Sequence, residues 1–166
     1  PDGIKNAPNA VIGTDIRDLG DDKEAYRWNF IIKNNRTRDD YSGIIELGKT
    51  FSTRGEELET RSEEVMDIET WMRTFALQSL VGTADTYNMG LAHNLELFHR
   101  PDGKMIPLPW DVDHGFYYSV RSKLTGAGGS NLARIINLKY NQRIFHKHLL
   151  DMVETTYNTD YLGSWA

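Results

Sequence analysis

The chain has 166 residues, of which 39% are hydrophobic and 26% charged, a composition typical of one globular domain and not of a disordered or fibrous protein. Its net charge of −5 argues against a general nucleic-acid binder, because neutralising phosphates requires clustered cations. The absence of cysteine excludes disulfides and thiol catalysis, and no apolar run approaches the roughly 20 residues of a membrane span.

The first third of the chain predicts a loop followed by two helices. Residues 1–20 are rich in Asn, Asp, Gly and Pro, which favour irregular structure. Apolar residues at helical spacing predict a helix over about 24–34, and a second one opens at Asp39-Asp40. Residues 55–69 carry seven acids and one base, a pattern typical of a solvated face or a linker.

The strongest helix signal follows Asp67, a good N-cap residue, and ends at Gly82. An apolar stripe runs along this helix and predicts that it forms the core of the domain. The stripe consists of Ile68, Trp71, Met72, Phe75, Leu77 and Leu80.

The second half predicts a β-hairpin and two closing helices. Residues 94–108 alternate like two strands around a Pro-Asp-Gly turn. A glycine-rich loop at 126–130 precedes helices over about 131–137 and 140–157. We therefore expect residues 1–166 to form a single domain of the α+β class, predominantly α, with the small hairpin packed on helices.

The candidate chemistry lies just after the hairpin, where Asp111 and Asp113 stand two residues apart. In an extended backbone both carboxylates would point to one face, and hard cations such as Mg²⁺ prefer oxygen ligands. Pro109, Trp110 and Phe116 flank the two acids and predict a fixed, partly buried loop. The alternative is a solvated turn with no ligand.

Two further polar residues precede the hairpin: Asp85 follows the core helix, and Asn94 lies nine positions later, seventeen before Asp111. Protein kinases use the same order of a catalytic Asp, a metal-binding Asn, a hairpin and a metal-binding Asp. Antiparallel strands bring their ends together, so we expect Asp85, Asn94 and Asp111 to converge. His93 is more often a structural histidine in such a position.

The order of these elements and the Pro-Trp-Asp-x-Asp motif resemble the spore coat protein H (CotH) kinase family. The resemblance covers about residues 65–162 and, more loosely, 20–64. The residues that carry it are Val65-Met66-Asp67-Ile68-Glu69-Thr70-Trp71, Ala76-Leu77, Gly82, Asp85, His93-Asn94, Leu97, Pro101-Asp102-Gly103, Pro109-Trp110-Asp111-Val112-Asp113 and Phe116, then Leu132, Ile135-Ile136, Tyr140, Arg143, His148-Leu149 and Thr156-Tyr157.

The resemblance implies a distant kinase-like fold, here its C-lobe, and an atypical protein kinase that phosphorylates serines of a protein substrate. It implies ATP and Mg²⁺ as cofactors, with Ca²⁺ or Mn²⁺ as possible replacements, and a spore-coat or secreted, cell-surface location. Asp85 resembles the catalytic Asp that orients the acceptor hydroxyl. Asp111 and Asn94 resemble the cofactor- and metal-binding pair, and Asp113 is either a second metal ligand or a residue that holds the loop.

One departure from a kinase leaves other functions open. No phosphate-binding lysine or glycine-rich loop can be matched in residues 1–64, where Lys23, Lys33 and Lys49 lie outside predicted strands. The sequence also starts at Pro1 without a Met, so we expect a catalytic fragment that is inactive or nearly so by itself. The alternatives are a non-catalytic, invasin-like adhesion module, or a structural domain in which Asp111 and Asp113 hold a divalent cation.

Overall fold

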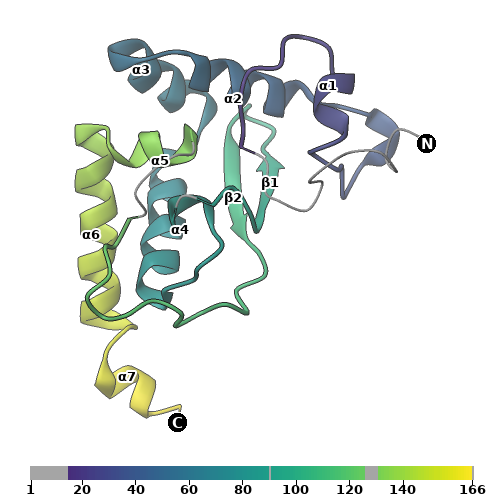
Figure 1. Cartoon of the computed structure of the whole chain (residues 1–166). Coiled ribbons are helices and arrows are strands. Elements are labelled where there is room, and N and C mark those ends of the chain that lie inside the picture. The colour runs from purple at the N-terminus through teal and green to yellow at the C-terminus, as the bar shows by residue number, and fades with distance from the viewer. Residues whose placement is uncertain (1–14, 90, 126–130, 166) are drawn as a thin grey trace.

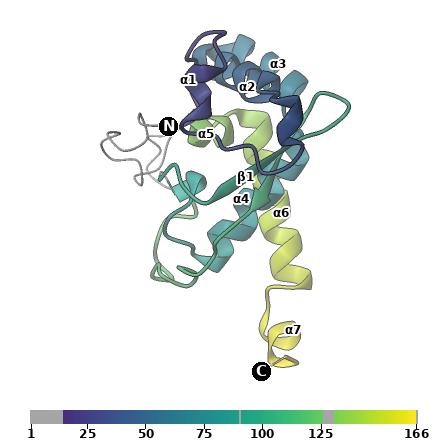
Figure 2. The same cartoon turned by 90° about the vertical axis from the view of Figure 1, so that its right-hand side faces the viewer.

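Helix α4 (Ile68–Val81) lies between helix α6 (Lys139–Thr155) and a β-hairpin in the computed structural model, which describes residues 15–89, 91–125 and 131–165 (Figure 1). Helices α2 (Ser42–Ser52) and α3 (Gly55–Val65) pack on one another across one end of this layered core (Figure 2). The fold is therefore α+β and predominantly α, as predicted.

Helix α4 begins and ends as its sequence predicts. Asp67 Oδ1 accepts the N–H of Thr70 at 3.1 Å, and Gly82 ends the helix in the left-handed conformation with φ of 66°. Trp71 is fully buried. The expectation that Leu77 belongs to the buried stripe is wrong, because nine residues of helix place it about 180° from Ile68; its exposed fraction is 41%.

The hairpin consists of β1 (Leu95–His99) and β2 (Met105–Pro109), which pair in antiparallel register from Leu95 opposite Pro109 to His99 opposite Met105. This confirms the predicted hairpin with a shift of one residue. The main-chain oxygen of Met105 accepts Trp71 Nε1–H at 2.8 Å and the N–H of Asp67 at 3.2 Å. These bonds fix the second strand to the start of α4.

The predicted helix over 24–34 is wrong, since α1 spans only Glu24–Arg27. The Arg27 guanidinium contacts both Glu24 and Asp39, at distances of 2.6–2.8 Å. Asp39 follows the short helix η2 (Arg36–Arg38), so this tertiary contact folds the chain back on itself after α1. Ile31, which a helix would have buried, is 72% exposed.

The acidic stretch at 55–65 is helix α3 and not a linker: its carboxylates face solvent while Leu58 and Ser62 are buried. Helix α5 (Asn131–Ile136) and α6 match the two predicted closing helices, and the short α7 (Thr159–Gly163) was not predicted. Residues 15–20 form neither helix nor strand, and the predicted loop at 126–130 lies outside the described residues. In the described part of the chain, no helix has the length and apolarity to cross a membrane.

Candidate functional site

Asn94 links the three segments that the sequence predicts to converge. Its side-chain nitrogen donates to Asp85 Oδ2 at 2.7 Å and to the main-chain oxygen of Asp111 at 3.2 Å. The first acceptor follows α4, the donor precedes β1 and the second acceptor follows β2. The hairpin thus returns its last residues to the place where it started, next to the end of the core helix.

Asp85 is held in a partly buried position, with a side-chain exposure of 20%. Nδ1 of His93 lies 3.7 Å from its Oδ2, the same oxygen that Asn94 contacts. Within the described residues, Asp85 Oδ1 and His93 Nδ1 are buried and have no hydrogen-bond partner. A buried polar atom without a partner is costly, and in native proteins it often marks a functional group or a site for water or an ion.

The condition under which Asp111 and Asp113 would share one face, an extended backbone after β2, is not met. Asp111 has φ of 52°, a left-handed conformation, so the backbone turns at that residue and the alternation that would put both acids on one face is lost. The side chain of Asp113 is 64% exposed, with His114 Nε2 at 3.7 Å from its Oδ2. In its contacts Asp113 therefore stands apart from Asp85 and Asn94.

The loop after β2 is also less buried than predicted: Trp110 is 54% and Phe116 76% exposed. Main-chain hydrogen bonds, and not buried side chains, hold this loop in position. The N–H of Phe116 donates to the oxygen of Val81 at 2.6 Å, and that of Tyr117 to the oxygen of Gly82 at 3.1 Å. The loop that carries Asp111 is thus attached to the C-terminal end of α4, just before Asp85.

Asn88 is a supporting residue that the sequence analysis missed. It is fully buried, and its side-chain nitrogen donates to the main-chain oxygen of Phe75 at 3.2 Å and to Ser79 Oγ at 2.9 Å. Thr86 Oγ1 donates to its side-chain oxygen at 2.5 Å. This network ties the segment that contains Asp85 back to α4. An Asn in a loop carries no local signal of such a role.

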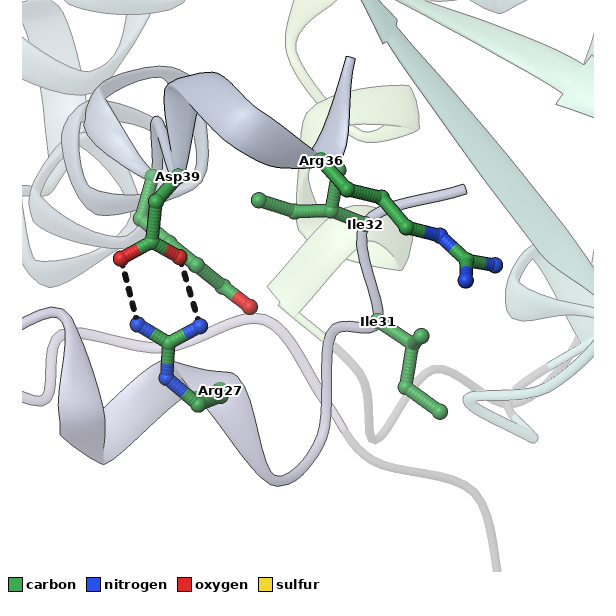
Figure 3. Close-up of a pocket in the computed structure, with 6 residues that line it drawn as sticks. Arg27, Ile31, Ile32, Arg36 and Asp39 are labelled. Atoms are coloured by element: carbon green, nitrogen blue, oxygen red, sulfur yellow. Dashed lines mark hydrogen bonds and ion pairs between the residues drawn. The ribbon is translucent and has the colours of Figure 1, made fainter. Parts of the chain in front are cut away.

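A surface hollow of about 270 Å³ lies elsewhere in the fold, and none of its lining residues is a candidate site residue (Figure 3). Two of its charged residues pair with each other, since two nitrogens of Arg27 donate hydrogen bonds to the carboxylate of Asp39 (Figure 3). Arg36 points away from that pair (Figure 3). The lining residues are Arg27, Ile31, Ile32, Arg36, Asp39 and Tyr41.

Comparison with known proteins decides the family. The profile of the family described as CotH kinase protein matches residues 13–161, which is most of the chain. The chain belongs to the CotH kinase family. No curated protein and no solved structure matches this CotH domain.

The kinase-like CotH family suggests ATP and a divalent cation in general. In the part of the chain that the structure describes, no three His, Asp or Glu side chains lie close enough to form a metal centre. The donor types nevertheless fit a hard cation: two carboxylates and one amide oxygen, with Asp85 Oδ1 lacking a hydrogen-bond partner among the described residues. Asn94 makes both of these contacts through its side-chain nitrogen, so they do not use its Oδ1.

Proposed function

We propose that this CotH domain transfers the γ-phosphoryl group of ATP to a serine hydroxyl of a protein. The observation that supports this most is the Asn94 amide, which joins the carboxylate of Asp85 to the backbone of Asp111. Phosphoryl transfer depends mainly on positioning and charge stabilisation, so a site needs few groups in exact places. An acid, an amide and a second acid at one end of a core helix meet that need.

In the proposed reaction, Asp85 orients the serine hydroxyl and accepts its proton as the oxygen attacks the γ-phosphorus. The bond from the γ-phosphorus to the β,γ-bridging oxygen breaks, and ADP leaves with that oxygen. Asp111 and Asn94 would hold Mg²⁺, and Asp113 would be a second ligand or hold the loop. A bound Mg²⁺ supplies positive charge that neutralises the phosphate oxygens.

The proposed acceptor is a serine-containing protein of a spore coat or cell surface, as the family resemblance implies. No phosphate-binding lysine or glycine-rich loop is matched in residues 1–64. We therefore expect residues 1–166 by themselves to transfer phosphate poorly.

The test is incorporation of radiolabelled phosphate from ATP into a serine-rich acceptor protein, with Mg²⁺, Mn²⁺ and Ca²⁺ compared, in the full-length natural protein and in residues 1–166. We expect Asp85→Asn and Asp111→Asn to reduce incorporation at least about 100-fold. Asp111→Asn and Asp111→Ala should also abolish Mg²⁺-dependent nucleotide binding while the protein stays folded. Asp160→Asn, a change of the same kind on α7, should leave both unchanged.

Activity equal to that of the unmodified protein in either acid variant would contradict the assigned roles. Robust incorporation by residues 1–166 would contradict the expectation that these residues transfer phosphate poorly by themselves. A Ca²⁺-dependent rise in the unfolding temperature without nucleotide binding would instead favour a structural cation site.

Exposed apolar side chains favour a second candidate, a binding or adhesion domain on the same scaffold. Phe116, Tyr117 and Val120 follow the acidic motif and are 76%, 69% and 102% exposed. Contiguous exposed apolar residues commonly mark contact with another protein. This candidate is favoured if the cellular role of the protein survives the double substitution Asp85→Asn with Asp111→Asn and is lost in Phe116→Ser.

A further inference from the structure

His93 lies beside the candidate catalytic acid and has no role in the proposed reaction so far. Its Nδ1 is 3.7 Å from Asp85 Oδ2, which is too long for a hydrogen bond. Within the described residues this nitrogen is buried and lacks a hydrogen-bond partner, although the His93 side chain as a whole is 39% exposed. This buried ring nitrogen therefore lies near a carboxylate, slightly beyond hydrogen-bond distance.

The backbone turns on both sides of His93. Its N–H donates to the oxygen of Leu91 at 2.7 Å, which closes a tight turn, and the next residue, Asn94, has φ of 50°. Asn94 already donates to Oδ2 of Asp85 at 2.7 Å. Two neighbouring residues thus approach the same carboxylate oxygen, one at hydrogen-bond distance and one about 0.8 Å beyond the usual 2.9 Å.

Catalytic hydrogen bonds are often long in unliganded sites and shorten when substrate binds. We propose that His93 is a positioning residue for phosphoryl transfer, whose Nδ1–H closes onto Asp85 and, with Asn94, fixes the plane of that carboxylate. This inference rests on the proposed function. The imidazole donates from Nδ1, and it touches neither ATP nor the acceptor hydroxyl.

Three substitutions separate the position of the donor from its presence. Asn places an amide nitrogen near the Nδ1 position, Gln places one near Nε2, and Leu has neither. We expect His93→Asn to retain kcat within about 3-fold, and His93→Gln and His93→Leu to lower it roughly 10- to 100-fold. The KM for ATP should change less than about 3-fold in all three, because a residue that orients the acid does not bind the nucleotide.

A purely structural histidine would give a different pattern. Full kcat in His93→Leu, or equal losses in the Asn and Gln variants, would overturn the positioning role. Unfolding midpoints and Mg²⁺-dependent nucleotide binding of each variant show whether a loss of kcat reflects misfolding or an altered site. A fall in kcat that parallels the fall in folded protein also overturns it.

The tautomer of His93 gives a readout that does not depend on activity. Two-bond ¹H–¹⁵N spectra of the 166-residue chain at about pH 8.5, where imidazoles are neutral, show which ring nitrogen carries the proton. The His93 signal is the one missing in His93→Asn. A proton on Nδ1 is expected, and a proton on Nε2 overturns the inference even if the enzyme transfers phosphate. The absence of any transfer by the unmodified full-length natural protein overturns the proposed function itself.

Discussion

The side-chain nitrogen of Asn94 lies 2.7 Å from the carboxylate of Asp85, nine positions earlier in the chain. The donor is neutral, so it can hold the acid without adding a charge that a nucleotide or cation would have to overcome. An amide also offers its oxygen on the other side. Its nitrogen is therefore used for the fold, and its oxygen remains for the cation contact proposed above.

Replacing Asn94 by Asp should reveal this contact directly. The variant places two carboxylates together, which raises the pKa of one of them and should cost roughly 1–3 kcal/mol of stability at neutral pH. When the pKa of an acid is higher in the folded state than in the unfolded state, the protein loses stability as the pH rises above the unfolded-state pKa of about 4. The deficit should therefore be larger at pH 7.5 than at pH 4.5 in urea unfolding.

Asn34→Asp is the matched control for that measurement. Asn34 is exposed, and its side-chain oxygen accepts the N–H of Asn35 at 2.7 Å, a bond that a carboxylate also makes. Its stability should change by less than about 0.5 kcal/mol. A deficit in Asn94→Asp that is equal at both pH values would contradict the assigned contact.

The hydrogen bond between Trp71 and Met105 predicts a second effect on stability. Trp71→Phe removes the Nε1–H that donates to the Met105 oxygen at 2.8 Å and leaves a gap in a fully buried site. We expect a loss of about 1–3 kcal/mol. Trp165→Phe, at a position 77% exposed, should change stability by less than about 0.5 kcal/mol. Similar midpoints for the two variants would show that the bond contributes little.

Local signals explain which parts of the fold the sequence predicts well. Helix α4 has an N-cap at Asp67, a left-handed glycine at Gly82 and a periodic apolar stripe, all readable from neighbours in the chain. The hairpin has its Pro-Asp-Gly turn. The prediction of a helix over 24–34 fails because the contact of Arg27 with Asp39 is tertiary and has no signature in the local sequence pattern.

The candidate site is predictable in its membership more than in its shape. That Asp85, Asn94 and the segment at Asp111 come together follows from the hairpin. The left-handed conformation of Asp111 does not, because long-range main-chain bonds from the 116–117 loop to the end of α4 set the path of the chain. Main-chain bonds are available to every residue type, so the sequence does not indicate which ones form.

Gly48 on α2 offers a test of close packing. A Cβ at this position would lie 2.6 Å from the main-chain oxygen of Arg17, and backbone cannot move aside as a flexible side chain can. Gly48→Ala should therefore destabilise the protein by roughly 1–3 kcal/mol. Gly163→Ala on α7, where a Cβ meets nothing within 4 Å, should be neutral or stabilising by up to about 1 kcal/mol. Equal effects in thermal unfolding would argue against that contact.

Asp39 should contribute to the pH dependence of stability. Hydrogen bonds from Arg27 and Lys23 hold the pKa of its carboxyl well below the usual range. Such an acid stabilises the fold above its unfolded pKa of about 4, and the contribution is lost as pH falls through the folded pKa. Asp39→Asn should lower the unfolding midpoint at pH 7, and the difference from the unmodified protein should vanish in strong acid.

High salt should also shrink the Asp39→Asn difference, since the Asp39 side chain is 35% exposed and surface ion pairs are screened. Asp160→Asn, an exposed acid on α7, serves as the reference. A difference that persists unchanged in strong acid would mean that the substitution acts through the backbone and not through the charge.

The left-handed backbone at Asn94 and Asp111 limits how this site can change over evolutionary time. With φ of 50° and 52°, both positions favour Asn, Asp or Gly, the residues that adopt this conformation at least cost. A lineage released from selection for chemistry would still be selected for folding at both positions. Relatives that have abandoned catalysis should then carry Asn or Gly at the counterpart of Asp111 more often than Ala or Val. An amide there could look conservative in an alignment while marking an enzyme that has become a scaffold.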